Sequence, residues 1–163
     1  MNITKLNSTF IYNAGTGVLT RKTSIGGQKA GSVCGTRMKA GHLRVRFDGK
    51  KQLVHRLVWV LEHNSDIPKG LEIDHINHDS SDNRIANLRL VTSRENGMNK
   101  SKLSRNKSGA TGVSLRASTN KWRARIKVDY KNINLGSFTE FHEAVNARKN
   151  AEVLYGFHKN HGT

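Results

Sequence analysis

Apolar and polar residues alternate in short runs over the first part of the chain, and glycine-containing turns separate these runs, a pattern typical of β-strands. Between residues 42 and 47 every second residue is apolar, and the residues between them include Arg44 and Arg46. An Asp-Gly pair, which favours a two-residue hairpin turn, follows directly. The pattern predicts a β-rich segment over residues 10–54 in which one face of a strand is basic.

The hydrophobic spacing changes to a helical period after this segment. Residues 55–63 place their apolar side chains on one face, which predicts a short amphipathic helix before the single proline, Pro68. The following stretch predicts a strand, a long polar loop, a second strand and a short helix that begins at a capping box. These elements fall at residues 71–74, 77–87, 88–91 and from residue 93 onward.

The last third of the chain again changes from strands to a helix. Three strand-like runs precede a helical pattern, and the middle run places Arg123, Arg125 and Lys127 on one face and apolar residues on the other. We expect a three-stranded antiparallel sheet packed on one helix, with the basic face free. The predicted ranges are 111–115, 122–128 and 133–138 for the strands and 139–155 for the helix.

Between these parts, residues 99–108 are polar, carry four basic side chains and show no hydrophobic period, which predicts a basic linker. The fold class that follows is α+β. The predicted domains are a β-rich segment plus a strand-strand-helix core over residues 1–98, the linker over 99–108, and a sheet-and-helix domain over 109–163.

The 163 residues carry a formal charge of +16, so a polyanion is the first partner to consider. Residues 65–100 hold 5 Lys and Arg against 6 Asp and Glu, whereas the segments on both sides are strongly basic. A merely solvated basic surface fits this distribution. An enzyme that cuts a polyanion fits it too, because basic flanks would hold the substrate while an acidic centre holds a metal ion.

Other features of the sequence narrow the class of protein. No apolar run is long enough to cross a membrane, and the N-terminus lacks the apolar stretch of a signal peptide, so we expect a cytoplasmic protein without a membrane partner. The single cysteine, Cys34, cannot form an internal disulfide. We interpret it as a small core residue because no base or metal partner lies near it in the sequence.

A carboxylate, an imidazole and two amides lie at the ends of the central strands and in the next helix. They would converge if the two strands pair and the helix packs across them. Asp74 and Asn96 offer the oxygen ligands that suit magnesium, with manganese as the alternative. His75 is mostly neutral at pH 7 and can accept a proton from an attacking water, and Asn87 can orient it. An isolated Asp-His pair is more often part of an ordinary turn, so the prediction depends on the whole set.

Four separated motifs contain these residues, in the order HRLVW at 55–59, EIDHIN at 72–77, DNRIANLRLVT at 82–92 and EN at 95–96. Together they resemble the His-Asn-His (HNH) homing endonucleases of phages, whose core is a ββα-metal fold. The resemblance implies that His75 is the general base and that Asn87 orients it. It also implies that Asp74 and Asn96 bind the metal.

A second set of motifs follows, with TGV at 111–113, KWRARI at 121–126, LGSF at 135–138 and EA at 143–144. Residues 109–156 thereby resemble the plant Apetala-two/ethylene-response-factor (AP-two/ERF) DNA-binding domain. The resemblance implies that the exposed face of the sheet contacts the major groove of double-stranded DNA. We expect DNA contacts from this face, from the linker and from the basic N-terminal strand, namely Arg116, Arg123, Arg125, Lys127, Lys102, Arg105, Lys107, Arg44 and Arg46.

The resulting hypothesis is a metal-dependent DNA endonuclease that cuts one strand per active site and is targeted by its C-terminal domain. We expect a monomer or weak dimer without another protein partner, in the host-cell cytoplasm if a phage encodes it. A DNA-binding regulator with an inactive nuclease core is the alternative. A basic RNA-binding protein would explain the charge but not the ordered Asp-His, Asn and Asn set.

Three residues need separate comment. His78 and Tyr130 stand where the resembled families more often carry glycine, in the active-site loop and in a hairpin turn. We expect His78 to point to solvent rather than to bring a second imidazole near the metal. His55, which opens a helix after a strand, is more often a structural than a catalytic histidine.

Overall fold

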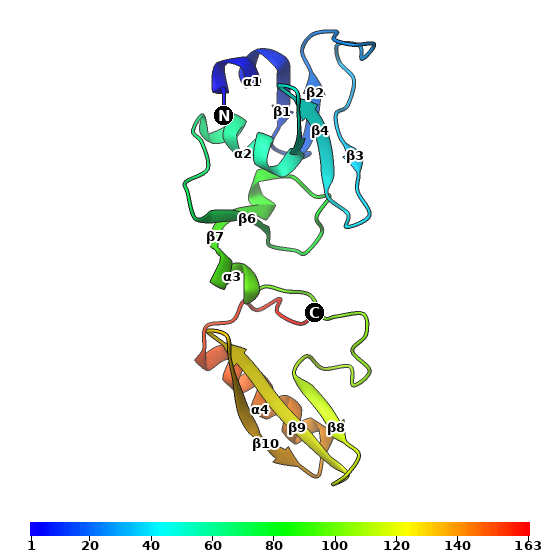
Figure 1. Cartoon of the computed structure of the whole chain (residues 1–163), viewed down its shortest axis with the longest axis vertical. Helices are drawn as coiled ribbons and strands as arrows, with labels where there is room; N and C mark the ends of the chain where they lie inside the picture. Colours follow the sequence, from blue (N-terminus) through cyan, green and yellow to red (C-terminus); the bar gives the residue numbers. More distant parts are fainter. The chain divides into compact units, whose positions relative to one another are not determined.

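The computed structural model describes residues 1–163, and the chain divides into two compact units, Met1–Ser93 and Arg94–Thr163 (Figure 1). Both units combine short antiparallel strands with helices, which confirms the predicted α+β class. The division lies before the segment 99–108 that the sequence predicts as a linker. None of the helices combines the length and apolarity needed to cross a membrane.

The first unit contains a two-stranded, a three-stranded and a second two-stranded sheet, ordered β1-β2, β3-β4-β5 and β6-β7. Helices α1 and α2 pack against each other and against strand β1. The elements are α1 (Ile3–Thr9), β1 (Phe10–Asn13), β2 (Val18–Arg21), β3 (Thr36–Arg37), β4 (Leu43–Phe47), β5 (Lys50–Leu53), α2 (Val54–His63), β6 (Leu71–His75), the 3₁₀ helix η1 (Ile85–Asn87), β7 (Leu88–Thr92) and α3 (Ser93–Gly97), which starts at the last residue of the unit.

The core of this unit forms where the amphipathic face of α2 meets the sheets. Leu57, Val58 and Val60 of α2 are fully buried, as the helical spacing of apolar residues predicts. Helix α1 has no counterpart among the predicted elements. Its seven residues bury only Leu6 completely, so the helix is too short for a hydrophobic period to reveal it. Cys34 lies in the same core, which confirms its interpretation as a small core residue.

Strands β6 and β7 pair in antiparallel register, and this pairing positions the candidate site. Asp74 lies opposite Arg89, and His75 lies opposite Leu88. The 3₁₀ helix η1 directly precedes β7. Its last residue, Asn87, therefore lies next to Leu88, which pairs with His75 at the end of β6. The predicted strands at 71–74 and 88–91 therefore exist and pair as expected.

The second unit is a three-stranded sheet ordered β10-β9-β8 with one long helix against it. Its core holds Ala124 and Ile126 of the middle strand and Ala144 of the helix, while Arg125 and Lys127 are exposed. This alternation confirms the predicted strand parity. The elements are β8 (Val113–Arg116), β9 (Lys121–Val128), β10 (Lys131–Phe138) and α4 (Phe141–Leu154).

Two aromatic residues of this unit occupy different environments. The Trp122 ring packs edge-on to Phe141 of α4, with ring centroids 4.7 Å apart, so it belongs to the core as the strand parity predicts. Tyr130 follows Asp129 in the β9–β10 turn, and both have positive φ angles of 64° and 46°. This conformation favours glycine, which explains why a tyrosine there is unusual.

Residues 99–108 make backbone contacts inside the second unit. The Lys102 N–H donates to the Thr163 carbonyl at 3.1 Å, and the Gly162 N–H donates to the Lys100 carbonyl at 2.9 Å. Asn99 is only 3% exposed. The basic side chains of Lys102, Arg105 and Lys107 nevertheless remain exposed to solvent.

Candidate active site

The adjacent residues Asp74 and His75 end strand β6, and both are buried, at 8% and 7% exposure. Arg89, their neighbour on β7, donates from Nε and Nη2 to Asp74 Oδ2 at 3.0 and 2.8 Å. The antiparallel register brings these two side chains onto the same side of the sheet. The Asp74 carboxylate is therefore held in a fixed position by a partly exposed arginine, which the sequence analysis did not single out.

The imidazole of His75 lies against the side chain of Asn83. His75 Nε2 is 3.3 Å from Asn83 Oδ1, and Asn83 Nδ2 donates to the Ser81 carbonyl at 3.2 Å. The Asn83 amide nitrogen donates to the Ser81 carbonyl, so the Asn83 amide oxygen faces the His75 ring. An amide oxygen can only accept a hydrogen bond, so Nε2 of His75 is the donor. This tautomer carries its proton on Nε2, so Nδ1 is the basic nitrogen of the ring.

Asn87 forms hydrogen bonds with the backbone of the residues that follow His75. Its Oδ1 accepts from the Asn77 N–H at 3.0 Å, and its Nδ2 donates to the Asp82 carbonyl at 2.8 Å. Its own carbonyl accepts from the Ile76 N–H at 2.9 Å. These bonds hold the backbone on the C-terminal side of His75, so they provide an indirect means by which Asn87 can position the ring.

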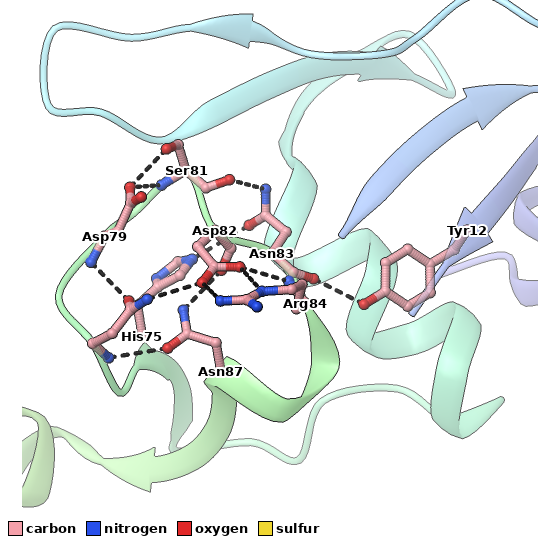
Figure 2. A network of polar contacts seen from close by, with 9 residues as sticks. Tyr12, His75, Asp79, Ser81, Asp82, Asn83, Arg84 and Asn87 are labelled. Atoms are coloured by element: carbon pink, nitrogen blue, oxygen red, sulfur yellow. Dashed lines mark hydrogen bonds and ion pairs between the residues drawn. The ribbon is translucent and has the colours of Figure 1, made fainter. Parts of the chain in front are cut away.

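The polar loop between β6 and η1 is held together by its own side chains (Figure 2). Arg84 forms a two-pronged contact with Asp82, at 2.8 and 2.6 Å, and this contact lowers the Asp82 pKa to about 2. Asp79 accepts from both the N–H and the hydroxyl of Ser81, which lowers the pKa of Asp79. These contacts hold the loop in one conformation beside the site.

His78 adopts a left-handed backbone conformation within this loop. Its φ angle is 66°, and its N–H donates to the His75 carbonyl at 3.1 Å. A residue without a side chain adopts this conformation most easily, which agrees with the expectation that glycine is the more usual residue here.

The β1–β2 hairpin at the N-terminus contacts the backbone of Asn83. The Tyr12 hydroxyl donates to the Asn83 carbonyl at 2.8 Å, and burial raises the pKa of Tyr12 to about 12. Gly17, with φ of +73°, packs so closely that a Cβ atom there would lie 2.6 Å from the Arg84 backbone nitrogen. Asn83 itself is 1% exposed. The β1–β2 hairpin therefore fixes the residue that contacts the His75 ring.

Two more histidines surround His75. The rings of His42 and His55 lie 5.1 Å apart between centroids, and each lies within 5.5 Å of the His75 ring. Burial, followed by the neighbouring His75, His42 and Arg56, lowers the pKa of His55 to about 3. Burial also lowers the pKa of His75, although the Asn83 hydrogen bond opposes the shift. Both rings are therefore neutral at physiological pH. The three could offer nitrogen ligands to a metal.

The remaining predicted site residues lie in several parts of the chain. Asn96 lies in α3 and belongs to the second unit, so its convergence with Asp74 stays a prediction. Arg46, Arg116, Arg125 and Lys127 are exposed, as are the three cations of the predicted linker. Arg44 and Arg123 are half-buried. Their contacts with DNA stay predictions as well.

Sequence reasoning missed three residues of this site, Asn83, Arg89 and His42. Arg89 could have been found from the predicted pairing of the two strands, which places it opposite Asp74. Asn83 is one of several polar residues in its loop, and nothing in its spacing distinguishes it. His42 lies just before β4, far from His75 in sequence, and only the fold brings their rings together.

The central part of the chain matches a known protein family. Residues 52–98 match the family described as HNH endonuclease. This range contains α2, β6, β7 and α3, and with them His55, Asp74, His75, Asn83 and Asn87. The chain belongs to the HNH endonuclease family.

Two viral proteins are similar to parts of the chain. An uncharacterized HNH endonuclease of Acanthamoeba polyphaga mimivirus is 39% identical over 70 residues, which are 43% of this chain and 37% of that protein. Protein 3.8 of Escherichia phage T7 is 35% identical over 83 residues, which are 51% of this chain and 68% of that protein. The chain thus spans only about a third of the mimivirus relative. No solved structure matches it.

Proposed function

We propose that the chain is a metal-dependent endonuclease that hydrolyses a phosphodiester bond of DNA, with His75 as the general base. The observation that carries this proposal is the buried Asp74-His75 pair, in which the bond to Asn83 places the ring proton on Nε2. Membership of the HNH endonuclease family supports it, as does the similarity to a mimivirus protein described as an HNH endonuclease.

His75 is suited to accept a proton. Its Nδ1 carries the lone pair, and burial keeps the ring pKa below its ordinary value, so the ring is neutral at physiological pH. A neutral imidazole can take a proton from a water molecule that attacks phosphorus. Asn83 would hold the ring through Nε2, and Asn87 would hold the backbone that follows it.

The residues present also fit a hard divalent cation. Magnesium is the first candidate, and manganese is the alternative. Asp74 is an almost buried carboxylate at the end of β6, and carboxylate oxygens are ligands that such a cation prefers. We propose that Asp74 and the amide oxygen of Asn96 hold this cation. When bound, it would supply charge stabilisation at the scissile phosphate and the leaving 3′ oxygen.

We further propose that the second unit selects the DNA site through the exposed face of its sheet. Arg125 and Lys127 project from the middle strand on the face away from the core residues Ala124 and Ile126. The three strands, the helix behind them and the partly buried Trp122 support the resemblance to the AP-two/ERF domain. Arginine can pair with guanine through two hydrogen bonds, so this face could recognise sequence as well as bind phosphate.

A single active site of this kind would cut one strand, so a monomer would nick double-stranded DNA. A double-strand break would need a second copy or a second event. The viral relatives support a place of action in the cytoplasm of an infected cell.

Incubation of supercoiled plasmid with the protein and magnesium tests the proposal. We expect conversion to the nicked circle, which a chelator abolishes. His75→Ala should remove the nicking and leave the affinity for DNA nearly unchanged. His63→Ala, on the same helix as His55 but outside the site, is the matched control. Tight DNA binding without cleavage under any metal would instead identify a DNA-binding regulator with an inactive nuclease core.

A further inference from the structure

Three histidines from separate elements of the first unit meet beside Asp74. His42 immediately precedes β4, His55 lies in the first turn of α2, and His75 ends β6. One ring nitrogen from each residue lies within 4.8 Å of the other two. The proposed reaction uses only His75, so it leaves the other two rings without a function.

The burial of polar atoms in these two rings reduces the stability of the fold. His55 is 6% exposed, and its Nδ1 has no hydrogen-bond partner. Nδ1 of His42 is also buried without a partner. Buried polar atoms are nearly always hydrogen-bonded, and one that is not often indicates an ion or a catalytic role. Two such nitrogens beside a third imidazole therefore indicate a ligand that all three share.

The chemistry of the three groups selects the ligand. Neutral imidazoles bind zinc, cobalt, nickel and copper, whereas magnesium prefers oxygen. Nitrogens on one tetrahedral zinc lie roughly 3.3 Å apart, given Zn–N distances of about 2.0–2.1 Å. The three nitrogens lie within 4.8 Å of one another, so binding would require each pair to approach by at most about 1.5 Å. Three histidines leave the fourth position of such a zinc open to water.

The surroundings of the cluster also suit a metal. Metal-binding histidines commonly donate their second ring N–H to a fixed acceptor, and Asn83 Oδ1 already accepts from His75 Nε2. The segment that carries His42 is tied to the active-site loop, because the Ser80 hydroxyl donates to the Ala40 carbonyl at 3.0 Å. Two of the three ligands are thus held in place by contacts outside the cluster.

We propose that His42, His55 and His75 bind one zinc-type transition-metal ion, and that this ion inhibits the nuclease. The ion would use the lone pair with which His75 accepts a proton from water. The inhibition rests on the proposed role of His75 as general base, whereas the binding of the ion does not. This site differs from the oxygen site of Asp74 and Asn96 in its ligands and in the metals that it would accept.

Cobalt titration of the full chain without DNA tests the binding. We expect one cobalt per chain with the visible absorption of a tetrahedral site, displaced by one equivalent of zinc. His42→Gln and His55→Gln should each weaken binding by more than about 100-fold, which exceeds the usual loss from removing an outer contact. His63→Gln, which alters an exposed histidine at the end of the same helix as His55, should leave binding unchanged. Equal cobalt binding by the wild type and His42→Gln would overturn the proposal.

Plasmid nicking with magnesium tests the inhibition. We expect one equivalent of zinc to inhibit the wild type and His63→Gln, while the nicking rate of His42→Gln is the same with and without this zinc. Inhibition of His42→Gln by the same zinc, or activation of the wild type, would refute the link between this site and inhibition. Tetrahedral cobalt binding by a protein that never cuts DNA would instead refute only the proposed nuclease function. Circular dichroism spectra of each variant confirm that it is folded.

Discussion

Asn83 Oδ1 lies 3.3 Å from His75 Nε2, and this contact determines which nitrogen of the imidazole carries the proton. The Asn83 amide is held in turn by the Ser81 carbonyl at its side chain and by the Tyr12 hydroxyl at its backbone. The basic nitrogen of the proposed catalytic histidine is therefore fixed by a loop residue that is almost completely buried.

Replacing Asn83 with Ala removes the acceptor for the His75 ring proton. We expect kcat for nicking to fall by roughly 10–100-fold, because the ring loses its preferred tautomer and orientation. DNA affinity should stay the same, since Asn83 is buried and cannot contact the substrate. Steady-state kinetics with a labelled duplex separates the two effects. Ser81→Ala removes a neighbouring loop hydrogen bond without touching the ring, so a similar loss of kcat there would count against this role.

Replacing Arg89 with Met removes both hydrogen bonds to Asp74 and keeps most of the apolar stem. We expect the free energy of unfolding to fall by about 1–2 kcal/mol, because a nearly buried carboxylate loses its charged partner while Arg89 itself is partly exposed to water. Urea denaturation gives the value. Arg116→Met changes an exposed arginine on another strand and should cost far less. Equal stability of the two variants would show that the ion pair contributes nothing.

His55 makes the fold sensitive to acid. Its pKa is about 3 in the folded chain, below its ordinary value, so the unfolded chain binds a proton at pH values where the folded chain does not. The contribution of His55 to the free energy of unfolding is thus fully present above about pH 6.5, and it is lost as the pH falls toward 3. The contribution of His55 should decrease by about 2 kcal/mol between pH 7 and pH 5.

Urea denaturation of the wild type and His55→Gln at the two pH values, with a chelator present, measures this contribution. The wild type should lose more stability than the variant as the pH falls. His75, whose pKa burial also lowers, remains in both proteins and accounts for part of the loss in each. Parallel losses in the two proteins would show that His55 takes up its proton without unfolding.

Replacing Gly17 with Ala tests the support that the N-terminal hairpin gives to the active-site loop. The new Cβ would lie 2.6 Å from the Arg84 nitrogen and 2.8 Å from the Asn83 carbonyl carbon, on a backbone with positive φ. We expect a loss of about 1–3 kcal/mol in stability, together with reduced nicking because Asn83 must move. Thermal unfolding and plasmid nicking give the two readouts. Gly26→Ala, where φ is also positive but no atom lies near, controls for the backbone strain alone.

DNA affinity should depend steeply on salt. If roughly 6–10 cations contact phosphates, the association constant should fall by about 10³–10⁵ between 50 and 200 mM salt. Arg125→Gln combined with Lys127→Gln should weaken binding and reduce the slope by about 2, whereas Lys149→Gln on α4 should do neither. Fluorescence anisotropy across a salt series measures both quantities. An affinity almost independent of salt would mean that most of the basic residues are only solvated.

The pattern of residues along the chain determined most of the secondary structure. Alternation in residues 121–128 predicted the buried and exposed faces of β9, because each side chain of a strand points opposite to its neighbour. The helical spacing after residue 54 predicted α2 in the same way. Helix α1 was not predicted, because seven residues with one buried apolar side chain show no period.

The sequence by itself also determined the family and the Asp74-His75 pair, since short ordered motifs contain them. Tertiary structure alone decided what surrounds His75. Asn83 reaches the ring because the loop folds back on itself, and His42 reaches it because β4 lies against the α2 segment that carries His55. Such contacts depend on how separate elements pack in three dimensions. Local hydrophobic patterns record which face of an element is buried, but not which distant side chain it meets there.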